Sequence, residues 1–215
     1  FWGWRTNLIA LGIISLTLIF FMILMLKETL INKAKSISFY NMFFVYKGLI
    51  QNNSFNFFTI TTAMQTSMFF AMNGFMPYEF ARKGVSISEF GIWFSLTSVG
   101  YIFGNIINSK LSPKLGLERM CLIGTVCSFS TVLIFFLNNN FLENGPLALS
   151  LICVLFGCSN GFAVANSMTG AINSSKLNKG AASGLMGAFQ VGSGGLAGFL
   201  TVSYTHLRAH ETYDH

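Results

Sequence analysis

The three histidines of the chain stand close together near its carboxyl end, at positions 206, 210 and 215. His206 and His210 are four residues apart, so a helix would place both imidazoles on one face. Glu211 follows directly, and imidazole and carboxylate groups are common zinc ligands. The spacing alone therefore indicates a metal site, and whether this interpretation holds depends on what the rest of the sequence predicts.

Side-chain amides inside long apolar segments form a second group that could contact a ligand. An amide in lipid is costly and usually faces protein or a cavity, although many amides only join helices by hydrogen bonds. One helix face carries amide, aromatic and thioether side chains, a combination that suits an apolar or cationic organic molecule; its members are Gln65, Phe69, Met72 and Asn73. We expect a cavity lined by Gln65, Phe69, Asn73, Asn160, Asn166 and Gln190, with Phe70 and Trp93 as further candidates.

Ionisable side chains are missing from the apolar segments themselves. The acids of the main body lie in connections or at segment ends, at Glu28, Glu79, Glu89, Glu118 and Glu143. A membrane-embedded protease or metalloenzyme needs an acid or metal ligands within the membrane. The sequence therefore predicts that the protein is not an enzyme and uses no cofactor, and a proton relay cannot be built from this chain alone.

Six apolar segments must position the amides. A bilayer core of about 30 Å requires roughly 20 apolar residues in a helix. Such segments lie near residues 7–26, 56–77, 90–109, 120–138, 146–169 and 182–202. Only 9% of the residues are charged, and six buried helices in a soluble core would leave no polar face for water. Because the segments lack the alternation of a barrel, they predict an all-α, polytopic transmembrane helix bundle.

The amides are not spread evenly over the segments. The second, fifth and sixth segments contain them, whereas the first and fourth contain none in their interiors. We expect the second, fifth and sixth helices to line a water-accessible cavity, and the first and fourth to face lipid.

The basic residues between the segments predict the orientation of the chain. Nine of them lie on one side, namely Lys27, Lys33, Lys35, Lys47, Lys110, Lys114, Arg119, Lys176 and Lys179, against Arg5, Arg82 and Lys83 on the other. Cytoplasmic loops are enriched in Lys and Arg, so the nine mark the cytoplasm. The run "SISFYNMFFVYKGLIQNN" is too short to cross and predicts a helix lying on the cytoplasmic leaflet. The basic residues form no stripe that would indicate nucleic acid.

Small residues recur at four-residue spacing, which lets membrane helices approach closely. The pairs are Gly100/Gly104, Gly157/Gly161, Gly180/Gly184, Ala188/Gly192 and Gly194/Gly198. The pattern Gly192-x-Gly194-x-x-Ala197 also occurs in nucleotide sites, but it lacks the preceding strand and the soluble βαβ unit that such sites need. The four cysteines fall in apolar runs without a CxxC pair, which predicts buried free thiols.

Four stretches resemble the major facilitator superfamily, and within it the Bcr/CflA group of drug-resistance transporters. "GWR" with the following span and "LKETL" resembles the sixth helix of that group, and "FFAMNGFMPYEFARKGVSISEFGIWFSLTSVGYIFGN" resembles its seventh and eighth helices. "KGAASGLMGAFQVGSGG" is similar to the eleventh helix. "GNIINSKLSPKLGLERM" resembles the basic cytoplasmic loop motif of the superfamily, represented here by Gly104, Lys110, Lys114, Gly116 and Arg119. The usual Asp of that motif is missing, and Ser112-Pro113 stands in its region.

The resemblance covers residues 1–201 and implies helices six to eleven of a twelve-helix protein. It implies a last helix of the amino-terminal half in residues 1–27, a cytoplasmic linker in 28–55 and an incomplete carboxyl-terminal bundle of five spans in 56–201. Alternating access of two halves around a central site would export drugs or other small organic molecules in exchange for protons. Helices seven, eight, ten and eleven would line the site, and the coupling carboxylate would lie in the absent half, so we expect the chain alone not to transport.

The resemblance further implies a multi-pass protein of the bacterial cytoplasmic (inner) membrane, with the lipid bilayer and a small organic substrate as partners and a monomeric full-length form. Two alternatives stay open. A carrier for a sugar, amino acid or metabolite would be favoured by a charge in helix seven or ten, and a membrane assembly subunit would show a stable stoichiometric partner.

The stretch "VSYTHLRAHET" contains two of the three histidines, His206 and His210, and resembles a translated transposon-end sequencing adapter, unlike any transporter helix. We therefore expect residues 202–215 to be a non-native tail, which is excluded from fold reasoning. The sequence predicts no metal site, with an external zinc site or an ordinary disordered tail as the alternatives.

Overall fold

A computed structural model describes residues 4–26, 39–142, 144–175 and 178–213, and the side chains of Phe39 and of residues 205–213 lie outside this description. Each secondary-structure element in these ranges is a helix. The chain divides into two units, residues 1–38 and 39–215, which are described separately. The charged linker residues 27–38 and the histidine side chains lie outside the described part.

The first unit contains one helix, α1 (Trp4–Met25), which coincides with the first predicted span. None of its residues is buried within the structure. The Ser15 and Thr17 hydroxyls donate to the carbonyl oxygens of Leu11 and Ile13, both at 2.8 Å. These two hydroxyls are therefore satisfied within the helix itself, as a lipid environment requires.

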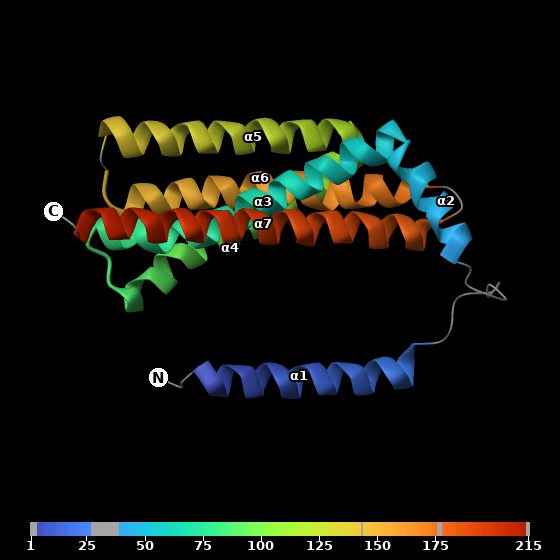
Figure 1. Cartoon of the computed structure of the whole chain (residues 1–215), viewed down its shortest axis with the longest axis horizontal. Helices are drawn as coiled ribbons and strands as arrows, with labels where there is room; N and C mark the ends of the chain where they lie inside the picture. Colours follow the sequence, from blue (N-terminus) through green and yellow to red (C-terminus); the bar gives the residue numbers. More distant parts are fainter. Residues whose placement is uncertain (1–3, 27–38, 143, 176–177, 214–215) are drawn as a thin grey trace. The chain divides into compact units, whose positions relative to one another are not determined.

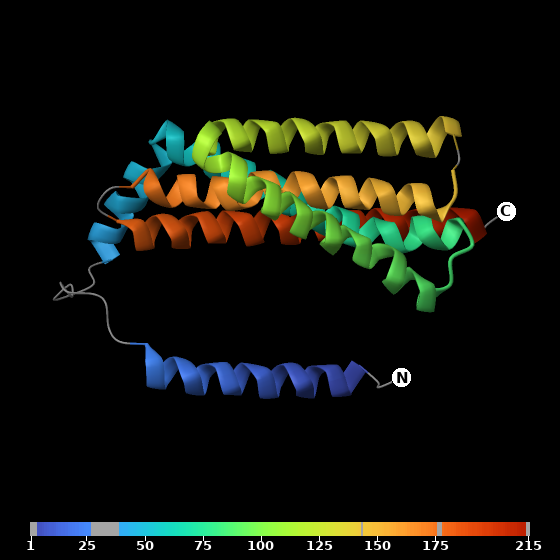
Figure 2. The same ribbon diagram turned by 180° about the vertical axis from the view of Figure 1, so that it is seen from behind.

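The second unit is a bundle of long helices with one short helix at its end (Figure 1). Its elements are α2 (Phe39–Ile50), α3 (Asn53–Arg82), α4 (Ile87–Leu115), α5 (Leu117–Leu137), the π-helical turn η1 (Asn138–Leu142), α6 (Pro146–Asn173) and α7 (Lys179–Tyr213). Helices α5 and α6 run side by side in both views (Figures 1 and 2). The predicted linker helix exists as α2, and its position on a membrane surface stays a prediction.

Five helices in the described part are long and apolar enough to cross a membrane: α1, α4, α5 extended through η1, α6, and α7 as far as Tyr204. Helix α3 covers the second predicted span and has 30 residues, but its many hydroxyl and amide side chains lower its mean hydropathy. The prediction of an all-α membrane bundle is therefore confirmed. The backbone of α7 stays helical through Tyr213, with no break at residue 201.

Local sequence signals set the ends of the helices. Asn52 caps α3, because its side chain accepts hydrogen bonds from the backbone N–H groups of Ser54 and Phe55. Ser86 and Glu89 form a reciprocal capping box at the start of α4. The chain turns from α4 into α5 at Gly116, whose φ of 84° favours glycine.

Helix α3 is longer than the predicted span, which ended at residue 77. It continues through Pro77 to Arg82. This extension places Glu79 inside the helix, where its side chain is buried.

Helix α6 lies at the centre of the bundle, and α4 approaches it closely through glycines. A Cβ added to Gly157 would lie 2.1 Å from the Thr97 carbonyl oxygen, and one added to Gly100 would lie 2.1 Å from that of Val154. Gly104 and Gly161 lie at the same crossing, against the backbones of Cys158 and Asn105. The predicted role of the pairs Gly100/Gly104 and Gly157/Gly161 in close packing is therefore confirmed.

The glycines of α7 differ from that prediction. A Cβ added to Gly180, Gly184 or Gly192 would meet no described atom within 4 Å. Gly194 does have a neighbour, since its added Cβ would lie 3.0 Å from the Phe70 ring of α3. At Gly194 helix α7 thus meets a side chain of α3, whereas α4 and α6 meet backbone to backbone.

Basic residues gather at one end of the second unit. The Asn52 side chain at the start of α3 donates to the Ser174 carbonyl oxygen at the end of α6, so these two helix ends lie together. Ser54, Gly116 and Asn173 line one surface hollow at the same end, which therefore also holds the α4–α5 turn. Five described basic residues belong to the segments that meet here, namely Lys47, Lys110, Lys114, Arg119 and Lys179, and this agrees with the predicted orientation.

Candidate functional site

A cavity of about 510 Å³ lies between four helices of the bundle, α3, α4, α6 and α7. Its size is within the range of pockets that hold small organic molecules. Its lining residues are Thr66, Phe69, Phe70, Gly91, Phe94, Ser95, Thr97, Ser98, Tyr101, Phe156, Gly157, Asn160, Val164 and Gln190. The cavity thus combines aromatic rings, hydroxyls and two side-chain amides.

Helices α3 and α7 form one wall of this cavity. The rings of Phe69 and Phe70 are each 42% exposed and meet edge to face, with centroids 6.0 Å apart. Gln190 of α7 is half-buried and belongs to the same wall. These two phenylalanines present large apolar surface that is not used in the protein core.

Helices α4 and α6 form the opposite wall. Asn160 of α6 is only 9% exposed, yet its side-chain amide makes no hydrogen bond with any described residue. Most buried side-chain polar groups in proteins have a hydrogen-bond partner. The Asn160 amide therefore has hydrogen-bonding capacity that water or a ligand in the cavity can use.

The cavity carries no Asp, Glu, Lys, Arg or His among its described lining residues. Its polar groups are uncharged, and the faces of its aromatic rings carry partial negative charge. Such a site suits an uncharged aromatic molecule or a delocalised cation that stacks on the rings. It offers no counter-charge to an anionic ligand.

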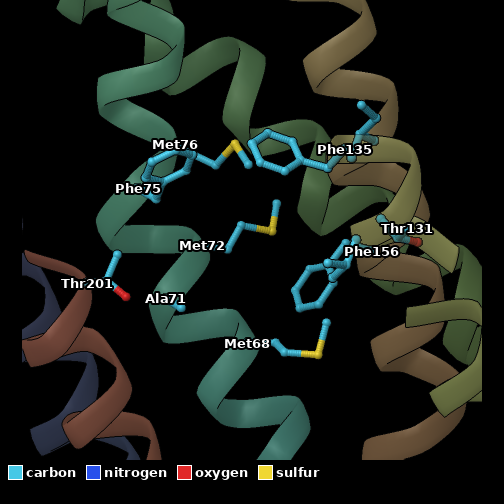
Figure 3. Close-up of a pocket in the computed structure, with 11 residues that line it drawn as sticks. Met68, Ala71, Met72, Phe75, Met76, Thr131, Phe135, Phe156 and Thr201 are labelled. Atoms are coloured by element: carbon cyan, nitrogen blue, oxygen red, sulfur yellow. The ribbon is translucent and has the colours of Figure 1, made fainter. Parts of the chain in front are cut away.

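A second, smaller cavity of about 270 Å³ is lined mainly by apolar side chains of α3, α5 and α6 (Figure 3). Met68 and Met72 extend from α3 toward Phe135 and Phe156. The two hydroxyls in its lining are already used, because Thr131 donates to Cys127 and Thr201 donates to Ala197 within their own helices. This cavity can accept apolar atoms but has no group that would orient a polar ligand.

Four of the eight residues predicted to contact substrate meet in the larger cavity: Phe69, Phe70, Asn160 and Gln190. The other four lie elsewhere, so their contact with a ligand stays a prediction. Gln65 is buried, and its Oε1 accepts a hydrogen bond from Ser128 of α5 at 3.0 Å. Ser128 also lies 2.8 Å from Ser159 of α6, so Gln65 joins three helices.

Asn73 and Trp93 lie outside the larger cavity for different reasons. The Asn73 amide is exposed and donates to the Phe69 carbonyl oxygen of its own helix at 2.7 Å. The Trp93 ring packs against the buried cluster that includes Met76 and Phe80.

Asn166 belongs to a polar contact between α4 and α6. Its Nδ2 donates to Asn108 Oδ1 at 2.6 Å, and its Oδ1 accepts a hydrogen bond from Ser112 at 2.7 Å. Ser112 stands in the region where the loop motif usually has Asp, so a neutral contact anchors the end of α4 here. Among the motif residues, Gly104 is buried against α6, Gly116 forms the turn, and Lys110, Lys114 and Arg119 are exposed.

The search for amides missed the contribution of α4 to the cavity, although the resemblance implied that helix eight, which is α4, lines the site. Phe94, Ser98 and Tyr101 follow one another at spacings of four and three residues, which is one face of a helix. A search for amides alone could not find this face, because its polar groups are hydroxyls. The same search omitted Asn108, which is buried and bound to Asn166.

Comparison with known proteins identifies one family. The family model of the Major Facilitator Superfamily matches residues 1–201, which is most of the chain. No curated protein and no solved structure matches the chain.

Proposed function

Because the chain belongs to the major facilitator superfamily of secondary transporters, we propose that it serves in the export of drugs or other small organic molecules, with the four-helix cavity as its substrate contact. Transport in this superfamily is a movement of helices around a central site rather than covalent chemistry, which is consistent with a protein that is not an enzyme. The chain is a multi-pass membrane protein.

The Asn160 amide is the observation that carries the proposal. It is nine-tenths buried, lines the cavity and has no hydrogen-bond partner among the described residues. Because the amide faces the cavity, water can bond to it, and a ligand that replaces this water with its own hydrogen bond gains about 0.5–1.5 kcal/mol. The rings of Phe69 and Phe70 border the same space and supply apolar contact.

The neutral lining favours one substrate class over another. An amino acid or a phosphorylated metabolite would bring a negative charge into a cavity whose described lining has no cation. A flat aromatic molecule, neutral or cationic, needs only the rings and one or two hydrogen bonds. This comparison supports drug-like substrates over charged metabolites.

Protons as the coupling ion, a monomeric full-length form and the bacterial inner membrane complete the proposal. They are supported by the resemblance to the Bcr/CflA group. The absence of an ionisable side chain from the described cavity lining means that this cavity would bind substrate while protons act elsewhere.

Binding of ethidium, a flat aromatic cation with amino groups, to the purified chain in lipid nanodiscs tests the substrate contact. Replacing Asn160→Leu removes the unpaired amide with little change in volume, and we expect weaker binding by about 1 kcal/mol, roughly fivefold in Kd. The matched control is Asn140→Leu, which removes an exposed amide that bonds to the Phe136 carbonyl oxygen and lies outside the cavity.

Equal affinities of the two variants, or no ethidium binding by the unmodified chain, would count against the proposed substrate contact. Thermal unfolding of each variant must be measured in the same nanodiscs. If the Asn160→Leu variant stays folded and binds ethidium with unchanged affinity, the Asn160 amide does not contact this ligand and the proposal loses its main support.

A further inference from the structure

Glu79 near the end of α3 is the one carboxylate that is buried among the described residues, with 3% of its surface exposed. It lies in the part of α3 that extends beyond the predicted span. Burying a charged group is costly unless it is paired and hydrogen-bonded. Its partners therefore decide which protonation state the site can hold.

The carboxylate has one counter-charge. Arg82, three residues further along the same helix, places its Nη2 2.9 Å from Glu79 Oε2. This contact lacks the angle of a hydrogen bond, and Oε2 receives no hydrogen bond from any described group. The same Nη2 donates to Asn139 Oδ1 in η1, so Arg82 divides its charge between the carboxylate and another helix.

The surroundings of Glu79 supply little further support for a charge. Met76, three residues before it, and Phe80, directly after it, pack into a cluster with Leu149 and Cys153 of α6. From α4 the cluster receives Phe90, Trp93 and Phe94, and from α5 it receives Phe135, none of which is charged. The titratable groups described around this end of α3 are Tyr78 and Arg82 of the same helix, the neighbouring Lys83, the Cys153 thiol of α6 and the fully exposed Glu89 at the start of α4.

We propose that Glu79 is a proton-binding site of this bundle, and that proton binding releases the Arg82 guanidinium from the Glu79 carboxylate. A proton from water forms an O–H bond with the carboxylate, which removes the buried charge and the attraction to the guanidinium. Arg82 has 45% of its side chain exposed and keeps its bond to Asn139, so it can remain with η1. No electron transfer or other reactant is involved.

The site is connected to the larger cavity through α3. This helix carries Glu79 near one end and also supplies Thr66, Phe69 and Phe70 to the cavity wall. A change of charge at Glu79 therefore acts on the helix that forms one side of the proposed substrate contact. The inference does not depend on the nature of the substrate, because it rests on the burial and pairing of Glu79.

Infrared difference spectroscopy across pH, on the chain in lipid nanodiscs, tests the proposal without any transport measurement. A protonated carboxylic acid that accepts no hydrogen bond has a carbonyl stretch well separated from carboxylate bands. We expect such a band to appear as the pH is lowered and to be missing in Glu79→Gln. The matched control is Glu118→Gln, which removes an exposed carboxylate and should leave the band unchanged.

A second variant keeps the test decisive if Glu79→Gln does not fold. In Arg82→Gln the carboxylate remains but its counter-charge is gone, so the charged form is less favoured and the band should appear at a higher pH. Absence of the band throughout the pH range in which the protein is folded would overturn the proposal. It would mean that Glu79 stays charged and paired with Arg82. A band that persists in Glu79→Gln, or does not move in Arg82→Gln, would overturn it as well.

Discussion

The crossing of α4 and α6 gives a quantitative prediction for Gly157→Ala. The added Cβ would lie 2.1 Å from the Thr97 carbonyl oxygen, against 3.4 Å for ordinary contact, a shortfall of 1.3 Å. The atoms on both sides are backbone and cannot rotate away, so we take the upper end of the usual cost of overpacking, about 3 kcal/mol. Alanine recovers about 1 kcal/mol through its higher helix propensity. We expect a net loss of about 2 kcal/mol in the free energy of unfolding.

Equilibrium unfolding in mixed detergent micelles, followed by circular dichroism, measures this loss. The matched control is Gly192→Ala, at a position where an added Cβ meets no described atom within 4 Å and only the gain in helix propensity remains. Equal stability of the two variants would refute the close approach of α4 and α6. In a Gly100→Ala, Gly157→Ala double variant the two losses should be less than additive, because either one already separates the helices.

Two further variants test the polar contacts of the bundle by thermal unfolding in nanodiscs. Ser128→Ala leaves the buried Gln65 Oε1 without its donor and should lower the free energy of unfolding by about 1–2 kcal/mol. Its control, Ser130→Ala, removes an exposed hydroxyl bonded within its own helix and should leave the stability almost unchanged. Similar losses of stability in both variants would contradict the Ser128–Gln65 contact. Asn52→Ala removes the cap of α3 and should lower the free energy of unfolding by about 1 kcal/mol, while Asn52→Asp keeps a capping oxygen and should lower it less. An Asp variant as unstable as the Ala variant would contradict the capping role of this side chain.

The helices could be predicted because lipid leaves the backbone few alternatives. The segments near 90–109, 120–138 and 146–169 all lie within observed helices, since an uncharged run of this length must satisfy its own hydrogen bonds. The boundaries were less predictable. Helix α3 runs five residues past the predicted end at residue 77, because Pro77 does not stop it.

The roles of individual polar residues could be predicted only in part. An amide at the same depth can line a cavity, as Asn160 does, or join two helices, as Asn166 does, and the difference depends on which neighbour it meets. Spacing along one helix contains no information about that neighbour. The Phe69 and Phe70 side chains were easier to place, because large rings on the same helix as amides indicate a face that is not packed into the core.

The unlike construction of the two cavity walls has a consequence for the range of ligands. Backbone contact at Gly100 and Gly157 fixes α4 against α6, so that wall cannot yield to a larger molecule. In the other wall the Phe70 ring lies over Gly194, where it can turn about its side-chain bonds, while Ser193 Oγ of α7 donates to the Ala63 carbonyl oxygen of α3 at 3.2 Å. Tolerance for molecules of different size should therefore reside in the phenylalanines of α3, and stiffening them would narrow the set of compounds that bind.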